Sequence, residues 1–378
     1  WAIFAVIQTG SIASIAYVFA EYLGYFVHLP RLGPELEGVS YHLFGPITVT
    51  PLAHLGLKLL TVAVIALLTG LNTLGVALGG AIQSLFTTLK VAAVGALVLV
   101  TFGVGQGSLG NFTDPGGVVP SLTAGGPWAL IAGVGLALSG AFWSYDGWNN
   151  VTFLAGEVKD PTRNMPLALG MGTALVVGVY MLVNLAYLYM LPVAEMAGSR
   201  LVAADVMQRV LGPVGGALIS GLVVISTFGS TNGSIMASAR VSFAMARDGL
   251  FFSRLGEVHP RFSTPAAALA VQGIWASVLV FSGSFDQLTD MLIFVSWIFY
   301  ALAALGVISL RRRMPDRHRP YRVWGYPLVP ALFVTFAATF VVVTLTQNPR
   351  DALFGLTLLA PGVLLYHYFK KGASDDRM

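Results

Sequence analysis

The sequence predicts an all-α integral membrane protein. Charged residues make up 10% of the 378 residues and hydrophobic residues 56%, whereas about 25% of the residues of soluble domains are charged. The mean hydropathy is +0.77. A soluble chain of this size could not cover its surface with so few charges. The sequence contains no cysteine, which excludes a disulfide scaffold. These observations leave a bundle of membrane-spanning helices.

Ten apolar segments are long enough to cross the hydrocarbon core of a bilayer, which needs about 20 residues per helix. We expect spans at residues 2–28, 52–70, 76–103, 128–155, 166–191, 211–245, 264–283, 288–310, 327–346 and 352–369. The Gly/Pro-rich segments 29–51 and 104–127 are expected to be loops, and 192–210 an external re-entrant or interfacial helix. The chain starts with Trp1 inside an apolar run, which we interpret as a fragment lacking its true N-terminus.

Basic residues are distributed unequally between the two sides of this topology. Fourteen Lys and Arg residues fall in the loops after the fourth, sixth and eighth spans and in the C-terminal tail, against four on the opposite side. Because basic loops stay in the cytoplasm, we expect a multi-pass protein of the cell membrane, plasma or inner, with a cytoplasmic C-terminus. This bias explains the net charge of +4 better than nucleic-acid binding does.

The third predicted span contains a lysine near its middle. Lys90 lies about fourteen residues from either end of the span, or about 20 Å along a helix axis, which is too far for its side chain to reach the interface. A charge at that depth normally faces a cavity or a partner inside the bundle. We favour a role as an ion surrogate or proton carrier for Lys90. A structural tether to backbone carbonyls is the alternative.

The middle of the fourth span is too polar for a continuous membrane helix. Residues 142–150 read FWSYDGWNN, and Asp146 is a natural N-cap for a second half-helix that starts at Gly147. Secondary transporters bind substrate where a helix is broken, because freed carbonyls and half-helix ends point into the cavity. We therefore expect the helix to be interrupted at residues 144–147. A buried kink without a binding role is the alternative, and Asp146 can act as a cap alone.

A polar stripe interrupts the sixth span. Asn232 and hydroxyl neighbours such as Ser230 lie inside an otherwise apolar helix. Such groups usually form hydrogen bonds between helices. Packing is the default interpretation, and support of an ion or substrate site is the other.

No motif in the sequence indicates a dinucleotide site, a metal site or an enzyme active site. Residues 105–110 formally match GxGxxG but follow a membrane helix rather than a strand, so a dinucleotide site is not expected. The six histidines are scattered, with no two within four residues of one another. We expect no metal, no cofactor and no enzyme activity.

Three long motifs carry a resemblance to a known family. YDGWNN with the following GEVKDPTRNMP resembles its sixth helix and loop. SARVSFAMARDGLFFSRLGEVHPRFSTP resembles the eighth helix and loop, and RRRMPDRHRPYRVWGYPLVP resembles the link between helices ten and eleven. The family is the amino acid–polyamine–organocation superfamily, and the motifs favour its L-type amino acid transporter branch.

This resemblance implies a leucine-transporter-like inverted-repeat bundle in which about ten of twelve transmembrane helices are present. The sequence would start at the third family helix. Residues 1–103 would then be the remainder of the first repeat, 128–310 the second repeat and 327–369 two C-terminal helices, all within a single transport domain over 1–378. The first family helix, which holds the carboxylate and amine of the substrate, would be absent.

The family pattern also implies roles for individual residues. Trp143 matches the aromatic gate over the substrate, and the carbonyls around Ser144 match positions near the substrate amine. Lys90 matches a lysine that stands where sodium-coupled relatives hold a sodium ion, which implies sodium-independent transport. The predicted substrate-binding residues are Trp143, Ser144, Tyr145, Asp146, Gly147 and Asn149.

We therefore expect a sodium-independent amino acid transporter that works by alternating access as an exchanger of neutral amino acids. A proton-coupled symporter using Lys90, a non-transporting fragment and a channel are the alternatives. Eukaryotic members of the family join a heavy-chain glycoprotein through a cysteine. Because this sequence has none, we expect no disulfide-linked heavy chain.

Overall fold

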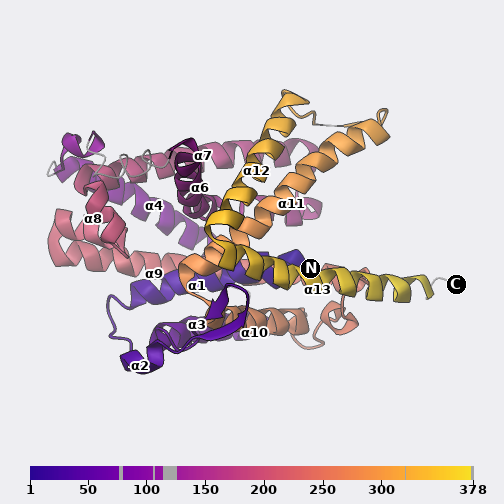
Figure 1. Ribbon diagram of the computed structural model, residues 1–378, viewed down its shortest axis with the longest axis horizontal. Coiled ribbons are helices and arrows are strands. Elements are labelled where there is room, and N and C mark those ends of the chain that lie inside the picture. Colours follow the sequence, from indigo (N-terminus) through magenta and orange to yellow (C-terminus); the bar gives the residue numbers. More distant parts are fainter. Residues whose placement is uncertain (76–79, 105–106, 114–125, 320, 376–378) are drawn as a thin grey trace.

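Ten long apolar helices dominate the computed structural model, which describes residues 1–75, 80–104, 107–113, 126–319 and 321–375. Each helix overlaps one predicted span (Figure 1). The first is preceded by a π-helical turn, η1 (Ile3–Ile7). The ten helices are α1 (Gln8–Leu23), α3 (Leu55–Thr73), α4 (Gly80–Val104), α6 (Gly126–Tyr145), α7 (Pro161–Met190), α9 (Val202–Arg247), α10 (Ala266–Ser282), α11 (Phe285–Arg313), α12 (Leu328–Gln347) and α13 (Pro349–Asp375).

The lengths of these helices fit a membrane protein. Within the described ranges, nine helical segments are at least 18 residues long and apolar enough to span a bilayer. The tenth, α10, has 17 residues, at the lower end of the range seen for spanning helices. The prediction of an all-α membrane bundle is confirmed.

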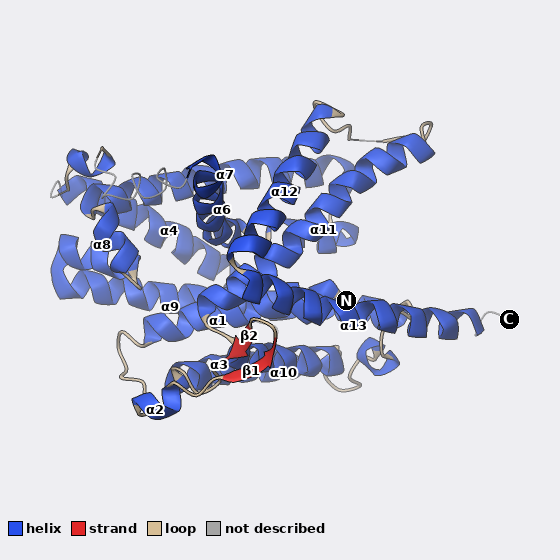
Figure 2. Cartoon of the chain, in the orientation of Figure 1, coloured by secondary structure: helices blue, strands red, loops and turns tan. Residues whose placement is uncertain are grey.

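The segment 29–51 is not the plain loop that its composition predicted. It contains a short helix, α2 (Pro34–Glu37), and an antiparallel hairpin of β1 (Tyr41–Phe44) and β2 (Ile47–Val49), shown in red in Figure 2. Aromatic and β-branched residues favour strands, and Gly45, with φ of +53°, lies in the turn between them. The other predicted loop, 104–127, falls largely outside the described residues, as does the start of its GxGxxG match. Its described part includes a 3₁₀ turn, η2 (Leu109–Phe112).

The segment 192–210 forms helix, as expected, but in two pieces. α8 (Val193–Gly198) is separated from the start of α9 at Val202. α9 is itself interrupted at Gly212, where φ is +68° and ψ is −163°, and Pro213 follows. Pro213 cannot donate a backbone hydrogen bond to the preceding turn. The first ten residues of α9 therefore form a separate arm before the long helix begins.

The buried core lies where α1 meets α9, α10 and α11. Ile12 and Ala16 of α1 and Leu292 and Val295 of α11 are fully buried. Small residues allow close helix approach, as is typical of membrane bundles. A Cβ atom added to Gly135 of α6 would lie 2.6 Å from Val343 of α12.

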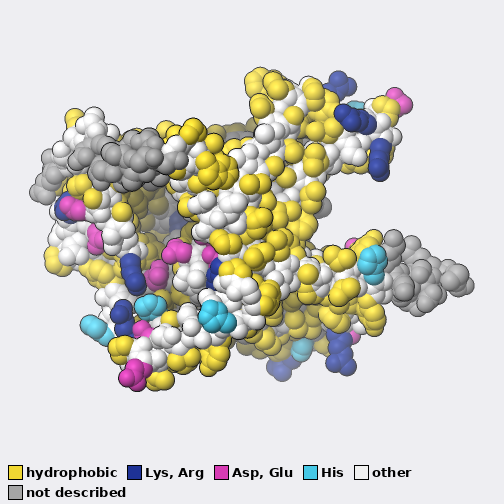
Figure 3. Space-filling model, in the orientation of Figure 1, with side chains coloured by type: hydrophobic (Ala, Val, Ile, Leu, Met, Phe, Trp, Pro, Cys, Tyr) yellow, Lys and Arg dark blue, Asp and Glu magenta, His cyan; other side chains and the backbone are white. Residues whose placement is uncertain are grey.

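The outer surface is largely apolar. Hydrophobic side chains cover much of the face seen in Figure 3, and a group of basic side chains gathers at the tip of the connection between α11 and α12. Leu175 of α7 and Leu364 of α13 are 68% and 74% exposed. An apolar exterior of this kind is suited to contact with lipid chains.

Candidate functional site

The fourth span is interrupted where the sequence predicted. α6 ends at Tyr145, and a 3₁₀ segment, η3 (Trp148–Glu157), follows. Gly147 lies between them with φ of +90°, a conformation that costs glycine little because it has no Cβ atom. The backbone N–H of Asp146 donates to the carbonyl of Trp143 (3.1 Å), and that of Asn150 donates to the carbonyl of Gly147 (3.0 Å). The chain therefore turns sharply at Asp146–Gly147.

The predicted capping role of Asp146 is wrong. Gly147, not Asp146, is the N-cap of η3, and no side chain caps that segment. The Asp146 carboxylate instead accepts a hydrogen bond from the Tyr300 hydroxyl of α11 (3.2 Å). Because Gly147 adopts a left-handed conformation, the chain reverses there without a side-chain cap, and Asp146 is directed to a neighbouring helix.

A pocket of about 370 Å³ lies between the interruption and α7. Its size falls in the range of small-molecule sites. The Tyr180 hydroxyl of α7 donates to the carbonyl of Ser144 (3.0 Å), and the rings of Tyr145 and Tyr180 are 4.9 Å apart. The residues that line it are Ser144, Tyr145, Asp146, Trp148, Val151, Ala168, Leu169, Gly172, Thr173, Val176 and Tyr180.

The other predicted substrate residues lie around this pocket without lining it. Trp143 is half-buried and packs edge-on against Phe285 of α11, with ring centroids 4.9 Å apart. Gly147 forms the turn itself. The carbonyl of Asn149 accepts a hydrogen bond from the Thr152 hydroxyl (2.7 Å). Three of the six predicted residues, Ser144, Tyr145 and Asp146, thus share one pocket, and the role of all six in binding substrate stays a prediction.

Lys90 and Ser230 come together between α4 and α9. The Lys90 ammonium donates to the Ser230 hydroxyl at 2.6 Å, and Lys90 is half-buried. Within the described part of the chain, no carboxylate lies within ion-pair distance of Lys90. The two residues were predicted separately, as a possible ion surrogate and as polar support, and form one contact.

Asn232 belongs to a different contact. Its side-chain oxygen accepts a hydrogen bond from the Asn72 amide of α3 (2.7 Å), and Asn232 is 5% exposed. The Asn72 amide also bonds to the carbonyl of Leu68 in its own helix (2.8 Å). This geometry supports the packing interpretation of Asn232.

A series of hydrogen bonds that the sequence analysis missed connects η3, after the break, to α1 and α9. The Gln8 amide of α1 donates to the Asn150 side-chain oxygen of η3 (2.9 Å), and the Ser238 hydroxyl of α9 donates to Gln8 (3.0 Å). Gln8 and Ser238 are 5% and 2% exposed. The sequence feature that could have indicated these contacts is the glutamine within the apolar run WAIFAVIQTG.

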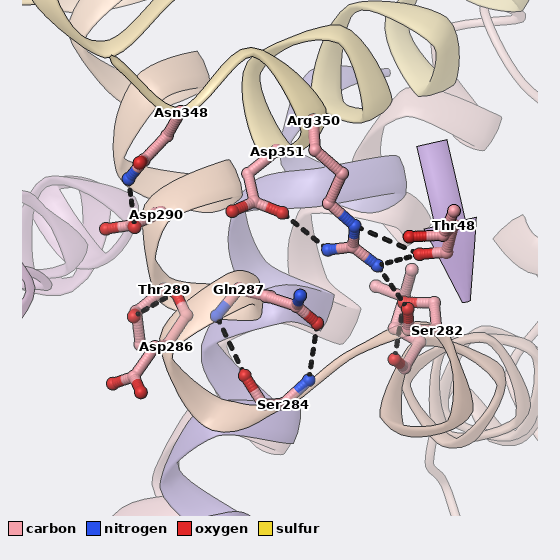
Figure 4. Close-up of polar contacts among 11 residues, drawn as sticks. Thr48, Ser282, Ser284, Asp286, Gln287, Thr289, Asp290, Asn348, Arg350 and Asp351 are labelled. Atoms are coloured by element: carbon pink, nitrogen blue, oxygen red, sulfur yellow. Dashed lines mark hydrogen bonds and ion pairs between the residues drawn. The ribbon is translucent and has the colours of Figure 1, made fainter. Parts of the chain in front are cut away.

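The sequence analysis also missed Asp290 of α11, which contacts α6 before the break. Its carboxylate accepts from the Ser139 hydroxyl of α6 (2.5 Å) and from the Asn348 amide at the α12–α13 junction (2.7 Å); Figure 4 shows the second contact. Ser139 lies one helical turn before Trp143 on the same face of α6. A carboxylate within an apolar span was the signal for Asp290.

Arg350, in the first turn of α13, joins its own helix to two further elements (Figure 4). It donates to the carbonyls of Thr48 in β2 (2.8 and 3.1 Å) and of Ser282 at the end of α10 (2.7 Å). It also pairs with Asp351 at 2.5 Å. The hairpin, α10 and α13 are therefore tied together beside the Asp290 contacts.

Comparison with known proteins points to one family. The family model described as amino acid permease matches residues 1–360. The chain is 27% identical over 372 residues to the human b(0,+)-type amino acid transporter 1, covering 98% of this chain and 70% of the relative. It is 31% identical to the human cystine/glutamate transporter, covering 91% and 68%. It is 30% identical to the serine/threonine exchanger SteT of Bacillus subtilis, covering 94% and 80%.

The similarity runs through the whole chain but not through the whole of every relative. The chain spans 60% to 62% of the length of the rodent and rabbit b(0,+)-type transporters. It spans 57% of the mouse large neutral amino acids transporter small subunit 2. The interrupted helix, the pocket and the contacts of Lys90 all lie within the matched residues.

Proposed function

Because this chain belongs to the amino acid permease family, we propose that it exchanges neutral amino acids across the cell membrane by alternating access and without sodium. The observation that carries the proposal is the interruption of α6 at Asp146–Gly147, which borders a pocket of about 370 Å³. The substrate occupies this pocket, and Trp143 forms part of the gate above it.

The chemistry of the pocket suits a neutral zwitterion. Asp146 offers a carboxylate to an ammonium group, and Tyr145 and Tyr180 offer hydroxyl groups. No Lys or Arg lines the pocket among the residues that the structure describes, so an extra negative charge on the substrate has no partner there. The lining of aliphatic residues from α7 suits an apolar or small substrate side chain.

The Lys90–Ser230 contact supports sodium independence. An ammonium group at 2.6 Å from the Ser230 hydroxyl places a fixed positive charge where a metal cation would be repelled. The word exchanger in the name of SteT, which is 30% identical, supports exchange as the mode of coupling. We propose exchange as the first candidate on these grounds.

Proton symport through Lys90 is the second candidate. The observation that favours it is that Lys90 is half-buried and has a hydroxyl rather than a carboxylate as its partner within the described ranges. A lysine amine can take up and release a proton, which is what a proton carrier requires. Transport would then respond to a pH gradient.

Uptake into proteoliposomes separates these candidates. Purified protein is reconstituted with or without internal amino acid, with or without a pH gradient, and with sodium replaced by choline. Exchange predicts uptake that requires internal amino acid and is unchanged in choline. Uptake into empty vesicles that follows the pH gradient would favour symport. Uptake that needs neither would contradict both.

The arrangement in the membrane is part of the same proposal. Fourteen of the basic residues lie on the side of the C-terminus and four on the other, which supports a cytoplasmic C-terminus. The inverted-repeat division into residues 1–103 and 128–310 is proposed by family resemblance. The cysteine-free sequence supports activity without a disulfide-linked heavy chain.

A further inference from the structure

A basic pocket lies at the connection between α11 and α12, away from the site described above. Its volume is about 620 Å³. The side chains that line it are mostly cationic, and Asp316 is the one acidic residue among them. The basic residues are Arg311, Arg312, Arg317, His318, Arg319 and Arg322.

Two of these arginines form contacts within the connection between α11 and α12. Arg319 folds back on the end of α11 and donates to the carbonyls of Met314 (2.6 Å), Arg317 (2.8 Å) and Pro315 (3.1 Å). The Arg311 guanidinium lies 3.9 Å from the ring centroid of Tyr326. These contacts supply donors to carbonyls at the C-cap of α11 and just beyond it, and they fix the wall of the pocket.

The remaining arginines are not paired with a carboxylate in the described part of the chain. Arg312, Arg317 and Arg322 are exposed, and none of them forms an ion pair in the part of the chain that the structure describes. Three guanidinium groups around one concavity repel one another. An anion bound between them would relieve that repulsion, and a guanidinium group suits phosphate because it can donate two parallel hydrogen bonds.

Aromatic residues place this pocket at the level of the lipid headgroups. Trp324 is 88% exposed and Tyr321 is 61% exposed. Tyr321 precedes the pocket residue Arg322 and Trp324 lies two residues after it. Leu328, at the start of α12, is itself 64% exposed. Exposed Trp and Tyr residues at the ends of membrane helices sit at the membrane–water interface. A phosphate at that depth belongs to a phospholipid.

We propose that this pocket binds the headgroup phosphate of an anionic phospholipid. The phosphate lies between Arg312, Arg317 and Arg322, and its acyl chains run along the exposed apolar start of α12. Free inorganic phosphate shares the anionic chemistry but would gain nothing from Trp324 and Leu328. Clusters of Arg at the end of a membrane helix are a known physical basis for recognition of anionic lipids.

Lipid binding to the purified protein tests this proposal. Native mass spectrometry measures how much phosphatidylglycerol and phosphatidylcholine the detergent-solubilised protein retains. The double variant Arg317→Gln/Arg322→Gln should lose roughly tenfold or more of its affinity for phosphatidylglycerol, with phosphatidylcholine binding unchanged. The matched control is Arg163→Gln/Arg254→Gln, which removes two exposed arginines outside the pocket, one in the first turn of α7 and one in the 3₁₀ turn at residues 253–256. It should retain phosphatidylglycerol as the unmodified protein does.

Three results would overturn the proposal. These are equal loss in the two double variants, no loss in either, and displacement of the lipid by millimolar inorganic phosphate alone. The single variant Arg312→Gln, which should lower phosphatidylglycerol binding to a smaller degree, replaces the double variant if that protein does not fold. Transport is not measured in this test, so its outcome does not depend on the proposed exchange of amino acids.

Discussion

At the scale of single residues, the site depends on one glycine. Gly147 adopts φ of +90° at the turn between α6 and η3. A residue with a Cβ atom is strained in this conformation, by about 1–2 kcal/mol. The interruption that borders the pocket is therefore encoded by the residue after Asp146 rather than by Asp146 itself.

Substitution of this glycine should destabilise the protein. We expect Gly147→Ala to lower the free energy of unfolding by about 1–2 kcal/mol and to reduce exchange, measured by thermal unfolding in detergent and by uptake. Gly140→Ala is the control, because Gly140 is also in the fourth span and an added Cβ there meets no atom within 4 Å. Equal effects of the two substitutions would contradict a special role for Gly147.

The Lys90–Ser230 contact makes a second prediction at this scale. A charge-assisted hydrogen bond contributes about 1.5–3 kcal/mol, so Lys90→Met should lower the exchange rate by roughly tenfold or more. Ser230→Ala should have a smaller effect in the same direction, because the charge stays. Lys159→Met removes an exposed lysine and should leave the rate unchanged. Normal exchange by Lys90→Met would exclude an ion-surrogate or proton-carrying role.

At the scale of elements, both sides of the break are held by polar contacts to other helices. Asp290 fixes α6 through Ser139, and Gln8 fixes η3 through Asn150. The segments on either side can therefore keep their positions although the helix between them is discontinuous. We expect these contacts to decide how accurately the pocket is formed.

Removal of the Asp290 charge tests this arrangement. Asp290→Asn should lower stability by about 1–3 kcal/mol, and its effect should not add to that of Ser139→Ala, because the two side chains share one contact. Thermal unfolding of the single and double variants measures the coupling. Asp286→Asn, one turn earlier and exposed, should be neutral. Strict additivity of Asp290→Asn and Ser139→Ala would refute the contact.

The elements were more predictable than their contacts. All ten spans follow from hydropathy, since a bilayer imposes a minimum length on each helix. The break at residues 144–147 follows from polar residues and glycine within an apolar run. The partner of Asp146 does not, because Tyr300 lies 154 residues away and spacing along the chain does not report it. The hairpin at residues 41–49 was missed because its glycine and proline were read as loop signals.

At the scale of the whole molecule, the structure combines a lipid-facing exterior with a polar interruption inside. Exposed aliphatic residues cover α7 and α13, while the pocket beside α7 brings together residues from the break. We expect substrate to bind in this pocket, because exchange by alternating access requires one site that both sides of the membrane reach in turn.

Protection of a single cysteine by substrate tests whether the substrate binds in the pocket at the break. The chain has no cysteine of its own, so Thr173→Cys in the pocket wall and Leu175→Cys outside it can each be labelled alone in proteoliposomes. We predict that a neutral amino acid slows alkylation of the cysteine at position 173 at the concentrations that half-saturate exchange, and leaves position 175 unaffected. Unchanged alkylation at position 173 by an amino acid that the protein demonstrably exchanges would contradict the account.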